Sequence, residues 1–538
     1  MTSGLIRVNG PYWGSTVHGE NVVIIGAGIG GLSAAALLAA RGLAVTVVEK
    51  EAAVGGKLRT LPPGGRPIDA GPTVFTMRWV FESIFAQSGG DFAASIKLSP
   101  LDILARHAWD DRETLDLHAD HAASVDAIAR FSSPDEGRRY ADFCAQAKRT
   151  YTTLEQPFLR GAKTSSLGLT QRIGFANIGA MMSIRPFTSM WNTLGRYFHD
   201  PRLQQLFGRY ATYCGSSPYL APATLMLIAH VEQSGVWSVA GGMHHVAKAM
   251  ADLATSNGAD IRCGQGCAAI ETKAGRVSAV RLDDGTVLSA DYVVANCDPA
   301  ALAAALFGPD VRSAVKPTAP KERSLSAFCW VIDAPTSGFP LSRHNVFFSP
   351  DYAAEFADIL GSSRPPSDPT VYVCAQDRDQ PDSIVTPGAP ERLQIIVNAP
   401  ANGDFAPLSP KEIALCETRM FARLNQCGLT INHVPERMTL TTPAQFNQLF
   451  PATGGALYGR ATHGWAAAFK RPGARTAIKG LYLAGGATHP GAGVPMAALS
   501  GWQAADSLSA DRASTSAFLP VATTGGTSMP LAKTDVTA

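Results

Sequence analysis

The sequence predicts an α/β fold built around a parallel β-sheet, and three observations support this prediction. Apolar strands alternate with a helix at residues 21–50, and a second block of helix and strands occupies residues 239–298. A third apolar strand, at 480–484, runs into a glycine-rich turn and another helix. Strands of a parallel sheet are covered on both faces and therefore read as continuous apolar runs. A chain of 538 residues can bury a large core and is expected to form two or three domains.

The first unit, Asn21–Lys50, has the pattern of a dinucleotide-binding βαβ segment. The strand Asn21–Ile25 leads into glycines at the G-x-G-x-x-G spacing, and a helix and a second strand ending at Glu49 follow. In this pattern Gly26 makes the tight turn, Gly28 admits a pyrophosphate, and Gly31 lets helix and strand pack closely. The phosphates would lie at the helix N-terminus, and Glu49 would bind ribose hydroxyls. The alternative is an ordinary βαβ unit in which the glycines fall by chance.

Three further segments are expected at the same edge of the sheet. Gly55-Gly56-Lys57 follows Glu49, although a surface turn would explain this pair of glycines alone. The loop at 68–73 comes next, and the turn after the strand at 480–484 opens the helix Met496–Leu508. The predicted cofactor-binding residues are Gly26, Gly28, Gly30, Gly31, Glu49, Lys50, Gly56, Lys57, Gly71, Pro72, Thr73, Gly485, Gly486, Gly493, Val494, Pro495 and Met496.

The rest of the chain is divided by its pattern of helices and strands. Residues 91–235 are expected to form a mostly helical insertion, and residues 306–454 a substrate-side sheet with the helix Pro410–Cys427 beneath it. The nucleotide-binding domain would then be discontinuous, comprising residues 21–90, 236–305 and 455–508. Residues 1–20 and 509–538 are predicted to be flexible, the latter because they are rich in Ser, Thr, Gly and Ala.

Composition excludes several classes of function. The net charge of +2 gives no reason to expect nucleic-acid binding. The nine cysteines are scattered and lack zinc-ligand spacing, so we expect reduced thiols, no metal site and a cytoplasmic setting. Residues 1–20 do not resemble a signal peptide, and no run reaches the roughly 18 apolar residues of a spanning helix.

The stretch Arg160–Arg209 suggests contact with a membrane surface. It carries seven basic residues and one acid, Asp200, interleaved with aromatic and aliphatic groups. A basic amphipathic stretch of this kind is typical of segments that lie on anionic lipid. The alternative is a solvated basic face over an ordinary core. If the protein meets a membrane, it is expected to lie on the membrane surface.

Three blocks in order carry a resemblance to a known family: GAGIGGLSAA…VVEK…VGGKLRT, VAGGM…GADI…DGTVLSADYVVAN, and LYLAGGATHPGAGVPMAALSG. Over nearly all of residues 21–508 the chain resembles the carotenoid and retinoid oxidoreductases, the bacterial phytoene desaturase family. Residues 69–78 and 105–117 are similar to the hydroxyneurosporene (methoxyneurosporene) desaturases of that family. The resemblance implies a Rossmann-like FAD-binding domain of the two-dinucleotide-binding-domain type, an inserted α+β substrate domain and a helical segment that contacts a membrane.

The resemblance also implies a reaction, the introduction of a C-3,4 double bond into an acyclic 1-hydroxy carotenoid such as 1-hydroxyneurosporene. Its long apolar substrate would enter from the membrane, and oxygen or a quinone would reoxidise the flavin. Non-covalent FAD is expected, because residues 484–508 contain no cysteine. Gly486 stands where monoamine oxidases usually have an acid, which disfavours an amine or amino-acid oxidase. A phytoene desaturase, a flavin-dependent polyene isomerase or saturase, and a non-catalytic carotenoid-binding protein remain as alternatives.

The polyene itself stabilises a developing allylic cation, so a strong catalytic base is not required. His489 is the sole ionisable side chain in the last glycine-rich turn and is the candidate for proton handling. His489 or Thr488 is also the predicted partner of the substrate hydroxyl. The alternative for His489 is a turn histidine hydrogen-bonded to the backbone.

Overall fold

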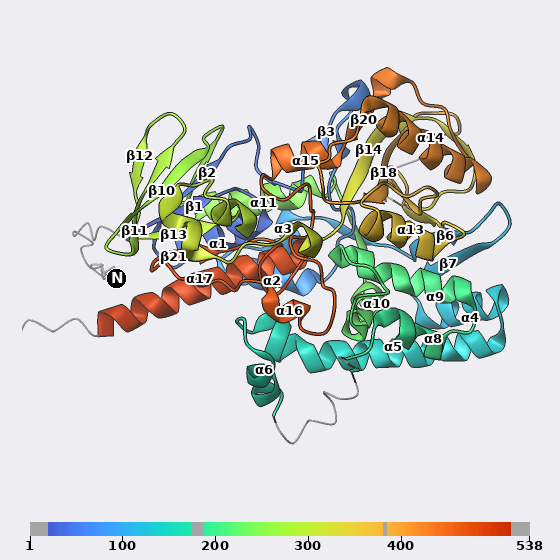
Figure 1. Ribbon diagram of the computed structural model, residues 1–538, viewed down its shortest axis with the longest axis horizontal. Coiled ribbons are helices and arrows are strands. Elements are labelled where there is room, and N and C mark those ends of the chain that lie inside the picture. The colour runs from blue at the N-terminus through green and yellow to red at the C-terminus, as the bar shows by residue number, and fades with distance from the viewer. Residues whose placement is uncertain (1–19, 175–183, 186, 380–384, 518–538) are drawn as a thin grey trace, which may run out of the picture.

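The computed structural model of the protein describes residues 20–174, 184–185, 187–379 and 385–517. A parallel five-stranded sheet forms one half of the molecule and a larger mixed sheet forms the other (Figure 1). In sheet order the parallel strands are β21 (Leu481–Leu483), β13 (Tyr292–Ala295), β1 (Asn21–Ile25), β2 (Ala44–Glu49) and β9 (Asp260–Cys263). The predicted first unit therefore lies at the centre of the sheet, as the fold class requires.

The two faces of the parallel sheet are covered by different layers. Along β1, Val22 and Ile24 pack into the helical core, whereas Val23 and Ile25 pack against a small antiparallel sheet. This alternation follows from the two-residue period of a strand. The helical layer consists of α1 (Ile29–Ala40), α2 (Arg78–Gln87), α11 (His244–Ser256) and α17 (Val494–Ala517), and the small sheet of β10 (Cys267–Lys273), β11 (Arg276–Leu282) and β12 (Val287–Ser289).

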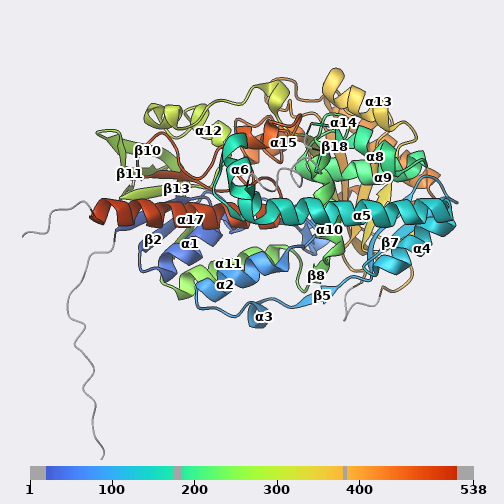
Figure 2. The same cartoon turned by 90° about the horizontal axis from the view of Figure 1, so that it is seen from below.

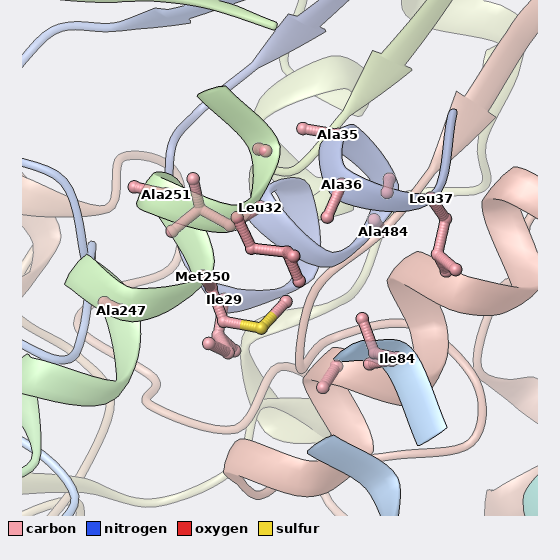
Figure 3. Packing of buried hydrophobic residues seen from close by; sticks show 14 of the residues in the cluster. Ile29, Leu32, Ala35, Ala36, Leu37, Ile84, Ala247, Met250, Ala251 and Ala484 are labelled. Atoms are coloured by element: carbon pink, nitrogen blue, oxygen red, sulfur yellow. The ribbon is translucent and has the colours of Figure 1, made fainter. Parts of the chain in front are cut away.

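Small residues let α1 pack closely against its neighbours. Figure 3 shows Leu32 of α1 beside Met250 of α11, with Ile84 of α2 nearby. A Cβ atom on Gly501 of α17 would overlap the carbonyl oxygen of Gly30. This close crossing brings the N-terminus of α17 next to that of α1, at the carboxyl edge of the sheet.

The second sheet has seven strands and is mostly antiparallel. The helix α14 (Pro410–Gln426), predicted beneath it, contributes Met420 and Leu424 to the core on one face. In sheet order the strands are β20 (Met438–Thr441), β14 (Ser326–Ala334), β18 (Glu391–Ala399), β17 (Val371–Ala375), β16 (His344–Phe347), β6 (Ile103–Ala108) and β7 (Thr114–His118).

The position of strands β6 and β7 differs from the one that the predicted domain division gives them. They lie within residues 91–235, expected to form a mostly helical insertion, yet they extend the sheet of the substrate domain. The parallel pairing of Val346 in β16 with His107 in β6 makes the connection. The insertion is therefore continuous with the substrate domain in the folded protein.

The helical part of the insertion packs around an aromatic core. Ser133 caps the helix α5 (Pro134–Leu154), whose Phe143 contacts Phe198 and Phe207. A π-helical segment, Glu155–Arg160, extends α5 toward α17, and the two helices run along the same side of the molecule (Figure 2). The other helices of this region are α4 (His121–Phe131), α6 (Ser166–Ile173), α8 (Met190–Tyr197), α9 (Pro201–Gly208) and α10 (Leu227–Gln233).

The remaining elements are short. They are α3 (Phe92–Ser95), α12 (Pro299–Ala303), α13 (Tyr352–Phe356), α15 (Pro443–Leu449), α16 (Ala467–Lys470), β3 (Thr60–Leu61), β4 (Ile68–Asp69), β5 (Leu98–Pro100), β8 (Trp237–Val239), β15 (Thr336–Gly338) and β19 (Leu429–Ile431).

The C-terminal prediction was wrong for residues 509–517. The helix α17 does not end at Leu508 but continues to Ala517. An ion pair of 2.8 Å between Arg475 and Asp511, and another between Arg512 and Glu20, hold the extension against the nucleotide half. Residues 1–19 and 518–538 of the predicted flexible termini lie outside the described residues. In the described parts of the chain, every helix is too short or too polar to cross a membrane.

Candidate active site

The glycine turn between β1 and α1 has the geometry of a nucleotide cradle. Gly26 has a φ of +97°, a conformation that glycine adopts without strain. A Cβ on Gly31 would overlap the carbonyl oxygen of Gly26, and one on Gly30 would lie 2.8 Å from the nitrogen of Gly485. Gly28 precedes the first residue of α1, so backbone N–H groups without partners inside the helix begin here.

Glu49 lies at the carboxyl end of β2, where its carboxylate is fixed by the backbone. It is 6% exposed, and its two oxygens accept hydrogen bonds from the N–H groups of Ala27 (2.8 Å) and Glu51 (2.9 Å). Each oxygen retains a lone pair for a further donor. This placement fits the expected contact with ribose hydroxyls.

The next two predicted segments lie against the glycine turn. Gly55 pairs with Gly28, and its N–H donates to the carbonyl of Ala27 at 2.9 Å. A Cβ on Gly71 would overlap the carbonyl oxygen of Lys57, so the loop after β4 is stacked on this segment. The Lys57 ammonium donates to the carbonyl of Leu457 at 2.6 Å, and burial lowers its pKa against the opposing effect of Asp298.

The last predicted segment closes the site from the other end of the chain. The N–H of Gly485 donates to Ser500 of α17 at 2.7 Å, which fixes the turn to the helix that follows it. Arg471, 3% exposed, donates to the carbonyls of Tyr458 (2.9 Å) and Gly486 (3.2 Å), and burial lowers the pKa of its guanidinium. The N-terminus of α17 at Val494 therefore has a defined position at the edge of the sheet.

Sequence reasoning missed Asn296, which follows directly after β13. Its amide donates to the carbonyl of Gly26 at 3.1 Å, and a Cβ on Gly28 would lie 2.9 Å from the same nitrogen. Ligands of open α/β sheets bind beyond the carboxyl ends of the strands. That rule, applied to the strand ending at Ala295, would have indicated Asn296.

One cavity of about 1520 Å³ connects these segments with an apolar region. All of the predicted cofactor-binding residues except Gly31 line it. It continues past Thr73 and Tyr372, whose hydroxyls are 2.6 Å apart, to a mouth formed by α6, α16 and neighbouring residues. The mouth residues are Phe158, Leu167, Leu169, Ile184, Phe187, Trp465 and Phe469.

The residues present fit FAD. The cradle at Gly28 and Gly30 has no room for side chains, the helix N-terminus accepts negative charge, and Glu49 has free acceptor capacity. The N-terminus of α17 supplies a second place where negative charge is favoured. These residues come from three distant parts of the chain and meet in one cavity.

The structure does not bring His489 or Thr488 to the cavity. His489 is 2% exposed, donates from Nε2 to the carbonyl of Gly161 at 3.0 Å and packs against the ring of Phe158. Thr488 donates to the carbonyl of Gly485 at 2.6 Å. Neither residue lines the cavity wall, so their predicted roles in proton handling and hydroxyl binding are not supported. The geometry of His489 matches the alternative, a turn histidine hydrogen-bonded to the backbone.

The basic stretch Arg160–Arg209 is largely engaged within the protein. Arg160 pairs with Glu155 at 2.8 Å and stacks on Trp79, and Arg172 donates to the carbonyls of Pro157 and Ala162. Arg202 pairs with Asp200 and Glu113, and Arg209 lines the cavity. Residues 175–183 and 186 of the stretch lie outside the described residues. Lys163 and Arg196 of the stretch are exposed, and so are two of its apolar side chains, Leu167 (63%) and Phe187 (66%). Together with Trp465 (49% exposed), Leu167 and Phe187 form an apolar rim around the cavity mouth.

Comparison with known proteins agrees with this geometry. The family model of the flavin-containing amine oxidoreductases matches residues 29–509. A hydroxyneurosporene desaturase of Rubrivivax gelatinosus is 52% identical over 96% of this chain and 98% of its own, and that of Cereibacter sphaeroides is 44% identical over 92% and 98%. An oxidoreductase from Methanosarcina mazei superposes with a TM-score of 0.58 at 17% identity, covering 90% of this chain and 99% of that one. The chain belongs to the flavin-containing amine oxidoreductase family, in the branch that contains the hydroxyneurosporene desaturases.

Proposed function

We propose that the protein is an FAD-dependent carotenoid desaturase that introduces the C-3,4 double bond into acyclic 1-hydroxy carotenoids such as 1-hydroxyneurosporene. The observation that carries this proposal is the single cavity of about 1520 Å³ that joins the FAD-binding segments to a long apolar wall. Its volume exceeds the roughly 300–1,000 Å³ of a pocket for one drug-sized ligand. There is room for a dinucleotide and for one end of a polyene, and the names of the relatives agree with such a substrate.

The chemistry divides between cofactor and protein. The bound FAD supplies the hydride acceptor, which no side chain provides. The apolar wall excludes water and aligns the polyene, while the hydrogen bond between Thr73 and Tyr372 fixes the loop beside the cofactor segments. The N–H groups at the start of α17 favour negative charge in this part of the cavity. We assign no catalytic base, because the polyene stabilises the positive charge that develops on it.

The substrate requires a route that avoids water, and we propose that it enters from a lipid bilayer at the cavity mouth. Phe187 and Trp465 project there with their rings 5.4 Å apart, and Leu167 lies on the same rim. Lys470, exposed at the end of α16, would face anionic headgroups. The protein would then lie on the cytoplasmic face of the inner or intracytoplasmic membrane, with oxygen or a membrane quinone as electron acceptor.

The reaction is tested with purified holoenzyme and carotenoids supplied in liposomes. We expect 1-hydroxyneurosporene to give a product with one more conjugated double bond and a red-shifted absorption spectrum. Phytoene should be a poor substrate, since it has a shorter polyene and no hydroxyl group. Equal turnover of phytoene would contradict the specific assignment, and no turnover of either carotenoid would contradict the desaturase assignment.

Membrane entry is tested by flotation with anionic liposomes. Replacement of Leu167, Phe187 and Trp465 together by serine should reduce the bound fraction, because the rim would lose the apolar area that it inserts. Leu415, which is 47% exposed on α14, offers a control, since its replacement by serine should leave flotation unchanged. Equal binding of the rim variant and the wild type would show that the rim does not contact lipid.

A further inference from the structure

A cluster of polar side chains interrupts the apolar wall of the cavity away from its mouth. Arg209 and Tyr213 come from a short 3₁₀ segment after α9, and Glu232 comes from α10. All three line the cavity, as does Tyr372 of the seven-stranded sheet. Sequence reasoning assigned Arg209 to a lipid-facing stretch and did not single out Tyr213, Glu232 or Tyr372.

Glu232 is an unusual residue for an apolar cavity. It is 7% exposed and accepts a hydrogen bond from the hydroxyl of Tyr210. Burial raises its pKa to about 7, against the opposing effects of Tyr210, Arg209 and Tyr213. A buried carboxylate destabilises a fold unless it is well paired, so its position at a cavity wall calls for a binding role.

Arg209 lies above two tyrosine rings and is not fully satisfied by the protein. Its guanidinium carbon is 5.6 Å from the ring centre of Tyr213 and 5.4 Å from that of Tyr372. The Nε atom has no hydrogen-bond partner among the described residues. The cluster therefore offers a cationic donor next to a carboxylate acceptor, which is what an alcohol group needs because it both donates and accepts.

The cluster is also on the side of the cavity where a 1-hydroxyl would have to lie. The ring of Tyr372 lies beneath Arg209, and its hydroxyl is 2.6 Å from that of Thr73, which belongs to a predicted cofactor segment. Hydride transfer requires the reacting carbon within roughly 3–3.5 Å of the acceptor. C-1 is only two bonds from C-3, so its hydroxyl must bind beside the cofactor and not at the mouth.

We infer that Arg209, Tyr213 and Glu232 form the subsite for the hydroxyl group of the substrate, an inference that rests on the proposed function. The guanidinium of Arg209 donates a hydrogen bond to the hydroxyl oxygen, and the hydroxyl group donates a hydrogen bond to the Glu232 carboxylate. Tyr213 interacts with both Arg209 and Glu232 and holds them in place. A polyene without the hydroxyl would leave both charged groups without a partner, and the enzyme would discriminate against it.

The test compares 1-hydroxyneurosporene with neurosporene, which lacks the hydroxyl, on the FAD-loaded enzyme. Wild type should favour the hydroxylated carotenoid by about 10- to 100-fold in kcat/KM, the range expected for hydrogen bonds to charged groups. In Arg209→Met and Glu232→Gln this ratio should fall toward one, mainly through a higher KM for 1-hydroxyneurosporene. FAD absorbance confirms that each variant is folded.

Glu355→Gln is the matched control. Glu355 is also a buried glutamate with a pKa raised to about 7 by burial, but it does not line the cavity, and its variant should keep the wild-type ratio. Quenching of tryptophan fluorescence gives the binding ratio of the two carotenoids independently of turnover. Wild-type ratios in both Arg209→Met and Glu232→Gln would overturn the subsite. Absence of turnover in the wild type would contradict the proposed function, while the binding ratios would still decide on the subsite.

Discussion

Replacement of Glu232 by glutamine should stabilise the protein at alkaline pH and leave its stability unchanged at acid pH. Burial raises the pKa of this carboxyl from 4.5 to about 7. Between these two values the folded protein holds a proton that the unfolded chain releases. The contribution of Glu232 to the stability of the wild type therefore falls as the pH rises through this window. Glutamine stays neutral and removes this dependence.

The size of the effect follows from the pKa. Raising it from 4.5 to about 7 destabilises the ionised carboxylate by about 3 kcal/mol in the folded state. This destabilisation applies in full above pH 7. It is absent below pH 4.5, where the carboxyl is protonated in both the folded and the unfolded state. The amide oxygen of glutamine can still accept the hydrogen bond from Tyr210. The variant should then gain up to about 3 kcal/mol relative to wild type at pH 8.

Thermal denaturation of both proteins from pH 4.5 to 8.5, at equal FAD concentration, measures this difference. The midpoints should coincide at the acid end and separate progressively as the pH rises. Glu355→Gln should give a curve of the same form, because burial also raises the pKa of Glu355 to about 7. A difference between Glu232→Gln and wild type that stays constant with pH would refute the reasoning, since Glu232 would then titrate as an ordinary carboxyl.

Three other predictions concern the cofactor, His489 and acid stability. Gly28→Val should lose FAD on desalting, because the valine side chain would fill the cradle beside Asn296. The wild type should retain FAD on desalting and release it in acid, as expected for a non-covalent cofactor. Retention of FAD by the variant at wild-type affinity would contradict the proposed FAD site. His489→Gln should keep most of the wild-type turnover of 1-hydroxyneurosporene, because His489 does not line the cavity. A turnover reduced by more than about 10³-fold with FAD still bound would instead support a catalytic role for His489. Burial lowers the pKa of His107, His463 and His489 to about 4, so below about pH 6.5 these histidines bind protons in the unfolded chain but not in the folded protein. The contribution of these histidines to stability is therefore lost between pH 6.5 and 4, and the denaturation midpoint of His489→Gln should rise relative to wild type as the pH falls through this range. A difference between the two midpoints that stays constant with pH would contradict this.

The nucleotide half was predictable from the sequence because its constraints are local. A strand, a glycine turn and a helix are adjacent in the chain. The steric requirement at position 31 can be recognised in the sequence because only a glycine satisfies it. The strands β6 and β7 could not be assigned to their sheet in this way. The partner of His107 is Val346, far along the chain, and no local pattern encodes that pairing. The extension of α17 was missed for the same reason, because Asp511 is held by Arg475 in another segment.

The residues of the candidate site can be divided in the same way, into those that a local sequence pattern predicts and those that it does not. Backbone cradles for a dinucleotide require glycines, and the sequence revealed them. The polar cluster needs only one arginine, one tyrosine and one glutamate from segments that are separate in the chain, so it has no sequence signature. Arg209 was assigned to the membrane because it occurs in a basic stretch. The fold instead turns its guanidinium over Tyr213 and Tyr372, into the cavity.

The position of this cluster bears on how one bond of a long polyene is selected. Apolar contacts are non-directional, so a polyene in an apolar tunnel can shift along its axis with little change in free energy. Because the double bonds repeat along the polyene, the cavity wall makes nearly the same contacts with it at successive positions along the axis. A directional contact at one end is therefore needed to fix which carbon faces the cofactor. Arg209 and Glu232 provide such a contact beside Thr73 and Tyr372, and the rim at Phe187 and Trp465 provides none. A carotenoid without the hydroxyl should then be bound in several positions, and the products of the Arg209→Met variant should include double bonds introduced at positions other than C-3,4.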